Sequence, residues 1–207
     1  MKNIPLHLVL SFVLVVMTLS AAPTPRQAEG PYYPLTKIDP QKKNTDWNLA
    51  EIDGGEAADG EFLELTGKVV TTDGKPLAGH KVEIWQTDDQ GHYNHRIAPN
   101  NDEFDARFQG FGAVMTQQDG SYRFMTIIPA RYPGRTPHIH LKVWRGDREL
   151  LITQVYFKDN ANSDDWIFSG SSKNKSLEVA LVPASLVLPE SKKTVKGFKS
   201  NFDVVLK

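Results

Sequence analysis

The sequence predicts an all-β protein, a single β-sandwich preceded by an irregular N-terminal arm. Short runs rich in apolar and β-branched residues recur after residue 61, and clusters of Gly, Pro, Asp and Asn separate them. No apolar stripe with helical spacing extends over three turns in residues 23–207. About seven short strands joined by such turns are typical of a sandwich.

The first 22 residues predict a secretory signal peptide. Lys2 supplies a positive charge, residues 8–19 form a mostly apolar run, and Ser20, Ala21 and Ala22 follow it. Such a run is short for a membrane span and ends in small residues, so cleavage is favoured over a retained membrane helix. We therefore expect an exported protein, periplasmic or secreted, with no membrane anchor after cleavage.

Composition narrows the classes of partner and of metal site. The chain has 24 Lys and Arg against 25 Asp and Glu, a formal net charge of −1, which gives no electrostatic reason to expect nucleic acid as a partner. Its 207 residues suffice for one domain with its own core. It has no cysteine, so it forms no disulfide, and any metal site must use His, Tyr, Asp or Glu.

The mature chain is expected to divide into an arm, residues 23–60, and a sandwich domain, residues 61–207. The arm has little periodicity and ends in an acidic, Gly-containing stretch. Its residues 30–34, Gly-Pro-Tyr-Tyr-Pro, predict a fixed turn.

The sandwich domain contains a series of predicted strands. Turn signals occur at residues 71–76, 88–91 and 119–120. Residues 159–175 predict an exposed loop without chemistry, and residues 184–200 favour no particular element. The predicted strands start at Phe62 and cover residues 62–65, 82–86, 121–127, 137–144, 150–157, 177–182 and 202–206.

Two histidines separated by one residue are the first candidates for chemistry. Side chains alternate between the two faces of a strand, so the three aliphatic residues of 138–144 share one face and pack in the core. His138 and His140 share the other face, within reach of one ion. By itself such a pair is more often polar surface than a metal site.

Two tyrosines strengthen the case for a metal. Tyr132 is followed by Pro133 and lies six residues before His138, and Tyr93 follows a Gly-containing turn directly after a predicted strand. Phenolate is stabilised by a trivalent cation, and hard oxygen donors with imidazole suit Fe(III). A zinc site of two histidines completed by Asp or Glu is the alternative.

The order of short motifs resembles the intradiol ring-cleavage dioxygenases, and most of all the iron-bearing β subunit of protocatechuate 3,4-dioxygenase. The similarity extends from about residue 24 to residue 157. The matching motifs are Gly-Pro-Tyr-Tyr-Pro at 30–34, Val-Glu-Ile-Trp-Gln at 82–86, Gly-His-Tyr-Asn-His at 91–95, Gly-Ser-Tyr-Arg-Phe-Met-Thr-Ile-Ile-Pro at 120–129, Tyr-Pro at 132–133, Arg-Thr-Pro-His-Ile-His at 135–140 and Leu-Ile-Thr-Gln-Val-Tyr-Phe at 151–157.

This resemblance implies a non-haem ferric ion and an O2-dependent cleavage of a catechol-type ring between its two hydroxylated carbons, which gives a muconate-type dicarboxylate. It implies that Tyr132 is the ligand that leaves the iron when the catechol binds and can take up a substrate proton. It also implies roles for the following residues: Tyr93, Tyr132, His138 and His140 as iron ligands, Arg135 in stabilising charge on the bound substrate, Gln154 beside the iron pocket, and Tyr32 and Trp85 lining the cavity.

Two features leave alternatives open. Only Pro133 and Gly134 separate Tyr132 from Arg135, where the well-known cytosolic relatives have a longer insertion, so the identity of the catechol is not determined. Residues 62–127 alone also resemble prealbumin-like modules, which predicts instead a non-catalytic binding module of an exported protein. A zinc-dependent hydrolase is a third reading. The expected partners are a small catechol and O2, and the chain is a candidate homo-oligomer.

Overall fold

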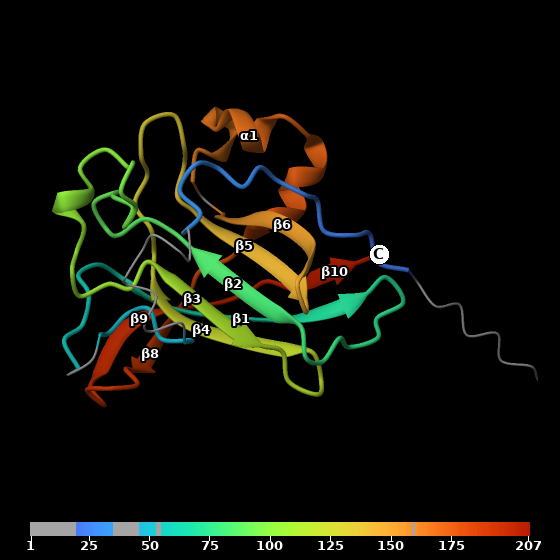
Figure 1. Ribbon diagram of the computed structural model, residues 1–207, viewed down its shortest axis with the longest axis horizontal. Coiled ribbons are helices and arrows are strands. Elements are labelled where there is room, and N and C mark those ends of the chain that lie inside the picture. Colours follow the sequence, from blue (N-terminus) through green and yellow to red (C-terminus); the bar gives the residue numbers. More distant parts are fainter. Residues whose placement is uncertain (1–19, 35–45, 53–54, 159) are drawn as a thin grey trace, which may run out of the picture.

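Two β-sheets packed face to face form the body of the protein, as the computed structural model shows for residues 20–34, 46–52, 55–158 and 160–207 (Figure 1). This arrangement confirms the predicted β-sandwich. The first sheet consists of β1 (Phe62–Thr71), β4 (Ser121–Ile127), β8 (Val182–Val187), β9 (Thr194–Asn201) and β10 (Val204–Leu206). The second has the order β3 (Phe111–Met115), β2 (Lys81–Trp85), β5 (His138–Arg145), β6 (Arg148–Phe157) and β7 (Glu178–Val179).

The first sheet is organised around β1, its longest strand. β4 pairs antiparallel with β1 on one side, whereas β9 and β10 pair parallel with successive parts of its other side. Leu63, Leu65 and Val69 of β1 alternate with more exposed residues and point into the core. This period of two is what the sequence of the strand requires for one buried face.

The inner face of the second sheet supplies the other half of the core. Ile139, Leu141 and Val143 of β5 are fully buried in the main hydrophobic cluster, together with Val82 and Ile84 of β2. The predicted alternation of β5 is therefore confirmed. Full burial of each such side chain stabilises the fold by about 1.5–3 kcal/mol.

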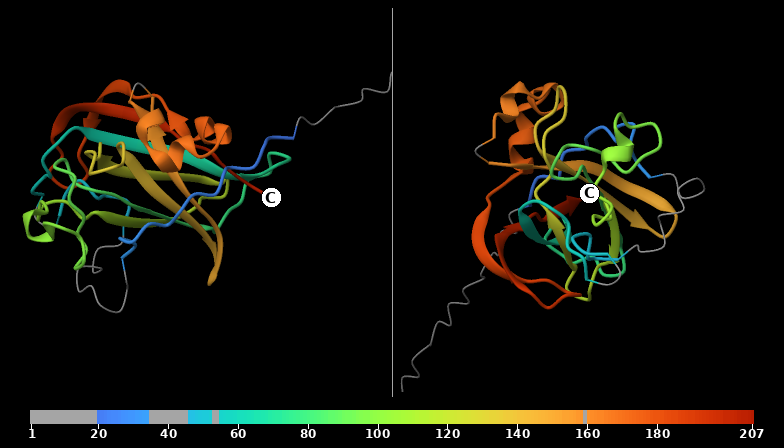
Figure 2. Two further views of the ribbon diagram at one scale, coloured as in Figure 1. Left: turned by 90° about the horizontal axis from the view of Figure 1, so that it is seen from above. Right: turned by 90° about the vertical axis from the view of Figure 1, so that its left-hand side faces the viewer.

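The outer face of the second sheet is also covered, which the alternation alone did not predict. Arm residues 25–28 lie along β6, where the backbone N–H of Gln27 donates to the carbonyl of Ile152 at 2.9 Å. The hydroxyl of Thr153 donates to the carbonyl of Pro25 at 2.8 Å. Figure 2 shows the arm (blue) running past β6 (light orange). Side chains on this outer face are therefore enclosed rather than solvated.

Three parts of the chain differ from the sequence-based expectations. Residues 111–115 form β3, and residues 184–200, which favoured no element, belong to the β8–β9 hairpin. Residues 159–175 are not simply an exposed loop: they include η2 (Asn162–Asp164), α1 (Trp166–Ser169) and most of η3 (Ser172–Leu177). Their polar residues Asn162, Asp165 and Asn174 are buried because they bond to backbone groups and to Arg135. The expectation of a wholly exposed segment was wrong.

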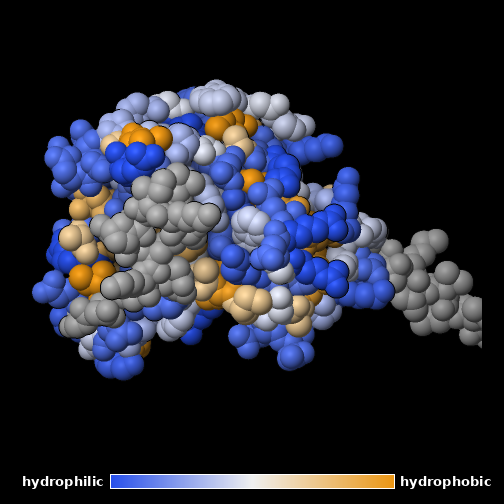
Figure 3. Space-filling model, viewed as in Figure 1, coloured by the Kyte–Doolittle hydropathy of each residue, from blue (hydrophilic) through white to orange (hydrophobic). Residues whose placement is uncertain are grey.

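The surface and the N-terminus complete the description. Figure 3 shows a largely hydrophilic face with hydrophobic residues in small, separate groups. Among the described residues, no helix is both long and apolar enough to cross a membrane. The predicted signal peptide, residues 1–22, lies outside the described residues except for its last three.

Candidate metal centre

The two histidines at the start of β5 converge on one point. Their Nε2 atoms are 3.2 Å apart, and both side chains are buried on the face of the sheet that the arm covers. The Nδ1 atom of His138 donates to the carbonyl of Thr136 at 2.6 Å, which assigns the proton to Nδ1 and leaves the lone pair of Nε2 directed toward His140. A strand start thus presents two imidazole nitrogens side by side.

The two tyrosines complete the cluster from other loops. The Tyr93 hydroxyl lies 3.1 Å from Nε2 of His140. The Tyr132 ring centroid is 5.6 Å from the ring of Tyr93 and 5.6 Å from the ring of His138, and the two phenol groups hydrogen-bond to each other. All four residues that the sequence singled out as ligands are therefore neighbours.

Burial sets the protonation of this cluster. Burial and the charge of Arg135 lower the pKa of His138 to about 3, and burial and the neighbouring His138 lower the pKa of His140 well below its usual value. Both imidazoles are consequently neutral at neutral pH and able to bind a cation. Burial raises the pKa of Tyr93 and Tyr132, so a nearby cation is needed to stabilise either phenolate.

The donor atoms fit a transition metal ion. Ligand atoms about 2.0–2.2 Å from such an ion lie about 3 Å from one another, which agrees with the 3.1 and 3.2 Å between neighbouring donors here. Two nitrogen and two hard oxygen donors suit ferric iron. The described residues contain no group of three or more His, Cys, Asp or Glu that could hold a metal ion, so the alternative zinc site lacks its carboxylate ligand within that part of the chain.

Arg135 extends the cluster beyond the four residues predicted to be ligands. Its Nη1 donates to the Tyr132 hydroxyl at 3.2 Å, and its Nη2 donates to Oε1 of Gln154 and, at 3.2 Å, to the hydroxyl of Tyr156. Burial disfavours its charge, but the oxygens of Tyr132, Tyr156 and Asp165 raise its pKa above the usual value. The guanidinium is therefore a permanent positive charge beside the ligand cluster.

A tight turn connects Tyr132 to Arg135. The backbone N–H of Arg135 donates to the carbonyl of Tyr132 at 3.0 Å, and Gly134 has a φ of 78°. Pro at the second position and a positive φ at the third are the signature of a type II turn, which favours Gly. The short Pro133–Gly134 link thus holds the phenol and the guanidinium in contact, while the turn itself is exposed.

The two residues predicted to line the cavity occupy different positions. Tyr32 on the arm packs against Tyr93, with ring centroids 4.7 Å apart, and approaches Tyr132 at 6.5 Å. The Trp85 ring stacks on His140 at 4.6 Å with an interplanar angle of 7°. Tyr32 borders the phenol side of the cluster, whereas Trp85 is fully buried and supports the imidazole. Contact of either residue with a substrate stays a prediction.

The arm reaches the cluster through a glycine. Gly30 has a φ of 76°, and a Cβ at this position would lie 3.4 Å from Cε1 of His140. Gln154 fixes the same segment, because its Nε2 donates to the carbonyl of Ala28 at 2.8 Å. The arm is therefore part of the site, and Gln154 joins it to Arg135.

Sequence reasoning missed three residues of this site. Tyr156 hydrogen-bonds to Gln154 at 2.8 Å and to Gln27 at 3.2 Å, and Asp165 accepts from Nε of Arg135 at 2.8 Å. The position of Tyr156, two residues after Gln154 on one strand, placed both on one face and could have indicated it. No local pattern indicates that Gln27 or Asp165 would reach the same cluster.

Comparison with known proteins finds similarity to dioxygenases. The family described as Dioxygenase matches residues 28–207 of the chain. The β chain of protocatechuate 3,4-dioxygenase from Burkholderia cepacia is 38% identical over 122 residues, which are 54% of this chain and 52% of that protein. Catechol 1,2-dioxygenase from Acinetobacter baylyi is 31% identical over 150 residues, 64% of this chain and 45% of that protein. The chain thus spans about half the length of these curated relatives.

Solved structures extend the similarity over nearly the whole chain. The dioxygenase domain of a dioxygenase–carbohydrate-binding protein fusion from Streptomyces sp. SirexAA-E has a TM-score of 0.65 and 30% identity, and the match covers 90% of this chain and 99% of that one. An intradiol ring-cleavage dioxygenase from Tetranychus urticae has a TM-score of 0.69, 23% identity and coverage of 90% and 95%, which establishes similarity of fold.

Proposed function

Because this chain belongs to the intradiol ring-cleavage dioxygenase family, we propose that it is an exported non-haem iron enzyme that cleaves a catechol-type ring with O2. Cleavage falls between the two hydroxylated carbons and gives a muconate-type dicarboxylate. The observation that supports this most is the convergence of two neutral imidazoles and two phenols beside a buried guanidinium. A prealbumin-like binding module has no need for this set.

We propose that Tyr93, Tyr132, His138 and His140 hold the iron. When bound, a ferric ion supplies Lewis acidity, which favours the ionised form of a catechol and of a phenol ligand. His138 and His140 belong to a central strand of the sheet and Tyr93 is buried, so these three are held rigidly. Tyr132 lies on an exposed turn and is only partly buried, which makes it the ligand best able to move aside.

Tyr132 and Arg135 then have complementary tasks. If a catechol oxygen took the place of the Tyr132 oxygen, a Tyr132 phenolate could accept the proton that the catechol loses. The Nη1 group of Arg135, which lies 3.2 Å from the Tyr132 hydroxyl, would then face the substrate oxygen. A fixed positive charge in a buried site stabilises negative charge that develops on the substrate ring. Tyr32 and the arm cover this side of the cluster and limit access of water.

Colour and oxygen uptake test the proposal together. Mature protein supplied with ferrous or ferric salt should retain iron and show a visible tyrosinate-to-iron absorption band, and it should consume O2 with at least one of catechol, protocatechuate, hydroxyquinol or an alkylcatechol. Tyr132→Phe should weaken and shift the band. Tyr122→Phe, which alters a buried tyrosine bonded to the carbonyl of Phe202, serves as a matched control and should leave the band unchanged. Protein that stays iron-free and colourless would overturn the proposal.

Export is the second part of the proposal and depends on residues 1–22. A charged start, an apolar run and small residues support it. Expression of the full chain followed by N-terminal sequencing and cell fractionation tests it directly. A protein that keeps Met1 and stays in the cytoplasm would refute export without affecting the proposed chemistry.

A further inference from the structure

Asp165 connects the ligand cluster to a segment that follows β6. It lies between η2 and α1, and its side chain is fully buried. One carboxylate oxygen, Oδ1, accepts the backbone N–H groups of Ile167 and Phe168 at 2.9 and 3.2 Å and so caps α1. The other, Oδ2, accepts from Nε of Arg135 at 2.8 Å and from the backbone N–H of Thr136 at 3.2 Å. A single carboxylate thus bonds both to a helix and to the loop that carries Arg135.

Two edges of the Arg135 guanidinium are fixed by these contacts. Nε bonds to Asp165, and Nη2 bonds to Gln154 and Tyr156. A guanidinium is planar, so two fixed edges determine where its third nitrogen points. That third nitrogen, Nη1, is directed at the hydroxyl of Tyr132. Without the bond to Asp165, the group could rotate about its contact with Gln154.

Asp165 also supplies the countercharge that a buried guanidinium requires. Arg135 is 6% exposed, and Asp165 is the carboxylate found in an ion pair with it among the described residues. Tyr132, Gln154 and Tyr156 offer neutral oxygens, which orient the guanidinium but do not balance its charge. A buried cation that loses its only paired anion moves toward water or changes its conformation.

We propose that Asp165 is a positioning residue for the ring cleavage, holding Arg135 so that Nη1 faces the oxygen of whichever group, Tyr132 or substrate, occupies that place. This inference rests on the proposed function. It assigns to the segment after β6 a task in the reaction, although no residue of that segment belongs to the ligand set. Asp165 acts through Arg135 and does not itself contact the ligand cluster in the contacts described.

If Asp165 had a purely structural role, its replacement by asparagine would have a different effect. Asn caps helices about as well as Asp, so Asp165→Asn can keep an oxygen toward Ile167 and Phe168. Its amide nitrogen then faces Nε of Arg135, and two donors cannot bond. If Asp165 served only α1, the variant would be fully active. If it positions Arg135, the helix should survive while catalysis declines.

The experiment uses the full-length, iron-loaded protein and four variants in a double-mutant cycle with a control. Asp165→Asn, Arg135→Gln and the double variant are compared with wild type, and Ser171→Ala removes another capping side chain of the same segment, which accepts from the backbone N–H of Lys173. For each protein we would measure kcat and KM for the preferred catechol. Anaerobic binding of that catechol is monitored by the change in colour, and the stability of α1 by hydrogen exchange at Ile167 and Phe168.

Asp165→Asn is expected to lower kcat/KM by about 10- to 100-fold, the range for residues that orient a metal site through a neighbour, with slow exchange at Ile167 and Phe168 retained. In the Arg135→Gln background the same substitution should cause little further loss, because the residue it positions is gone. Ser171→Ala should match wild type. Where Arg135→Gln folds poorly because it leaves Asp165 unpaired, the Asp165→Asn variant still decides through its kcat/KM and the hydrogen exchange at Ile167 and Phe168.

The outcomes separate this inference from the proposed function. Wild-type protein that turns over no catechol would overturn both. An active wild type with an equally active, folded Asp165→Asn variant would overturn the positioning role alone. The same conclusion would follow if Asp165→Asn lowered kcat/KM by the same factor in the wild-type and in the Arg135→Gln background. A loss of activity in Asp165→Asn that is accompanied by fast exchange throughout α1 would identify Asp165 as a structural cap.

Discussion

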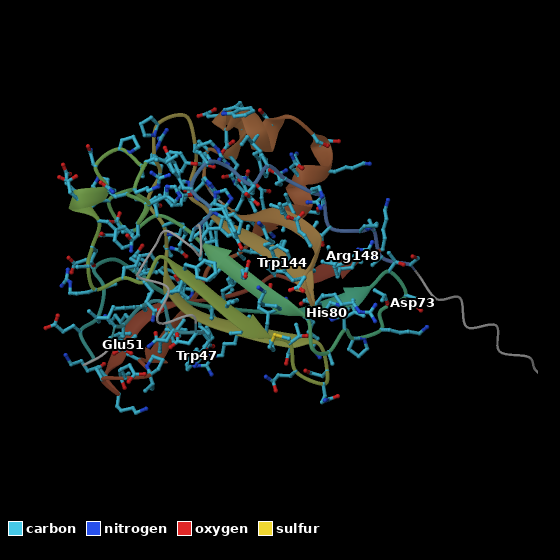
Figure 4. All side chains as sticks on the ribbon, viewed as in Figure 1. Trp47, Glu51, Asp73, His80, Trp144 and Arg148 are labelled. Carbon is cyan, nitrogen blue, oxygen red and sulfur yellow. The ribbon has the colours of Figure 1, made fainter. Side chains whose placement is uncertain are left out.

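Replacement of Glu51 by glutamine should destabilise the sandwich without touching the ligand cluster. Glu51 is 1% exposed and lies beside the β8–β9 hairpin, at the lower left of Figure 4. Its carboxylate accepts the backbone N–H groups of Glu190 and Ser191 at 2.8 and 3.0 Å, and the side-chain amide of Asn48 at 3.3 Å. It therefore joins the segment before β1 to the hairpin turn.

The magnitude follows from these bonds. A hydrogen bond to a charged group contributes about 1.5–3 kcal/mol, and a neutral one about 0.5–1.5 kcal/mol. Glutamine keeps one acceptor oxygen, so one of the two backbone N–H groups at Glu190 and Ser191 loses its partner and the other bond becomes neutral. The free energy of unfolding at pH 7 should fall by about 2–4 kcal/mol.

The pH dependence has a definite sign. Burial opposes ionisation of Glu51, but the hydrogen bonds from Ser191, Glu190 and Asn48 outweigh it, and the pKa lies below the usual 4.5. A carboxylate with a lowered pKa contributes stability above its unfolded pKa and loses it as the pH falls through the folded value. The difference between wild type and Glu51→Gln should therefore be full at pH 7 and shrink below about pH 4.5.

Urea unfolding at pH 7 and at several values down to pH 3 measures both effects. Glu56→Gln is the matched control, since it makes the same change five residues later at an exposed position. A Glu51 variant within about 0.5 kcal/mol of wild type at pH 7, the scatter of ordinary surface substitutions, would refute this account. A gap that stays constant down to pH 3 would refute the assignment of the effect to the charge.

Three further predictions concern the site and the arm. Gly30 has a φ of 76°, so Gly30→Ala places a Cβ in a strained backbone conformation. The free energy of unfolding should fall by about 1 kcal/mol or more, and KM for the catechol should rise. Unchanged urea unfolding and an unchanged KM would contradict the docking of the arm. Removal of iron by a chelator should abolish the colour but leave the circular dichroism of the sandwich, because the core lies on the opposite face of β5; loss of the β signal would show that the metal holds the fold. Lys142 is a buried lysine that pairs with Glu29, and its Nζ lies 3.5 Å from the centroid of the Tyr33 ring. Because Glu29 can be solvated once this partner is gone, Lys142→Met should change the free energy of unfolding by less than about 1.5 kcal/mol, measured by urea unfolding.

The parts of the site that a local pattern determines could be predicted from the sequence. The alternation along β5 placed His138 and His140 on one face, and the structure confirms their proximity. Pro133 and Gly134, which separate Tyr132 from Arg135, are residues that favour the type II turn observed there, although only the shortness of this link entered the sequence-based prediction. In each case the physical cause lies within a few residues of the chain, so the sequence contains it.

Other parts depend on partners far along the chain. The bond between Arg135 and Asp165 spans 30 residues, and nothing around Asp165 distinguishes it from an ordinary residue of a polar loop. Whether the outer face of β5 is solvated or enclosed depends on where the arm lies, and the arm has no periodicity of its own. Val182 and Val187 of β8 are exposed, so the strand shows no clear apolar face, and the β8–β9 hairpin escaped prediction.

The route of the arm also affects the order in which parts of the protein fold. Its bonds from Pro25, Gln27 and Ala28 close loops of 128, 129 and 126 residues. Contacts so distant in sequence form late, since the chain must first lose the entropy of a long loop. The first part of the arm to be synthesised is thus among the last to dock, and the cluster of Tyr93, Tyr132, His138 and His140 is covered only when β6 is in place. If the proposed export carries the chain across a membrane unfolded, the proposed iron site forms only after transport.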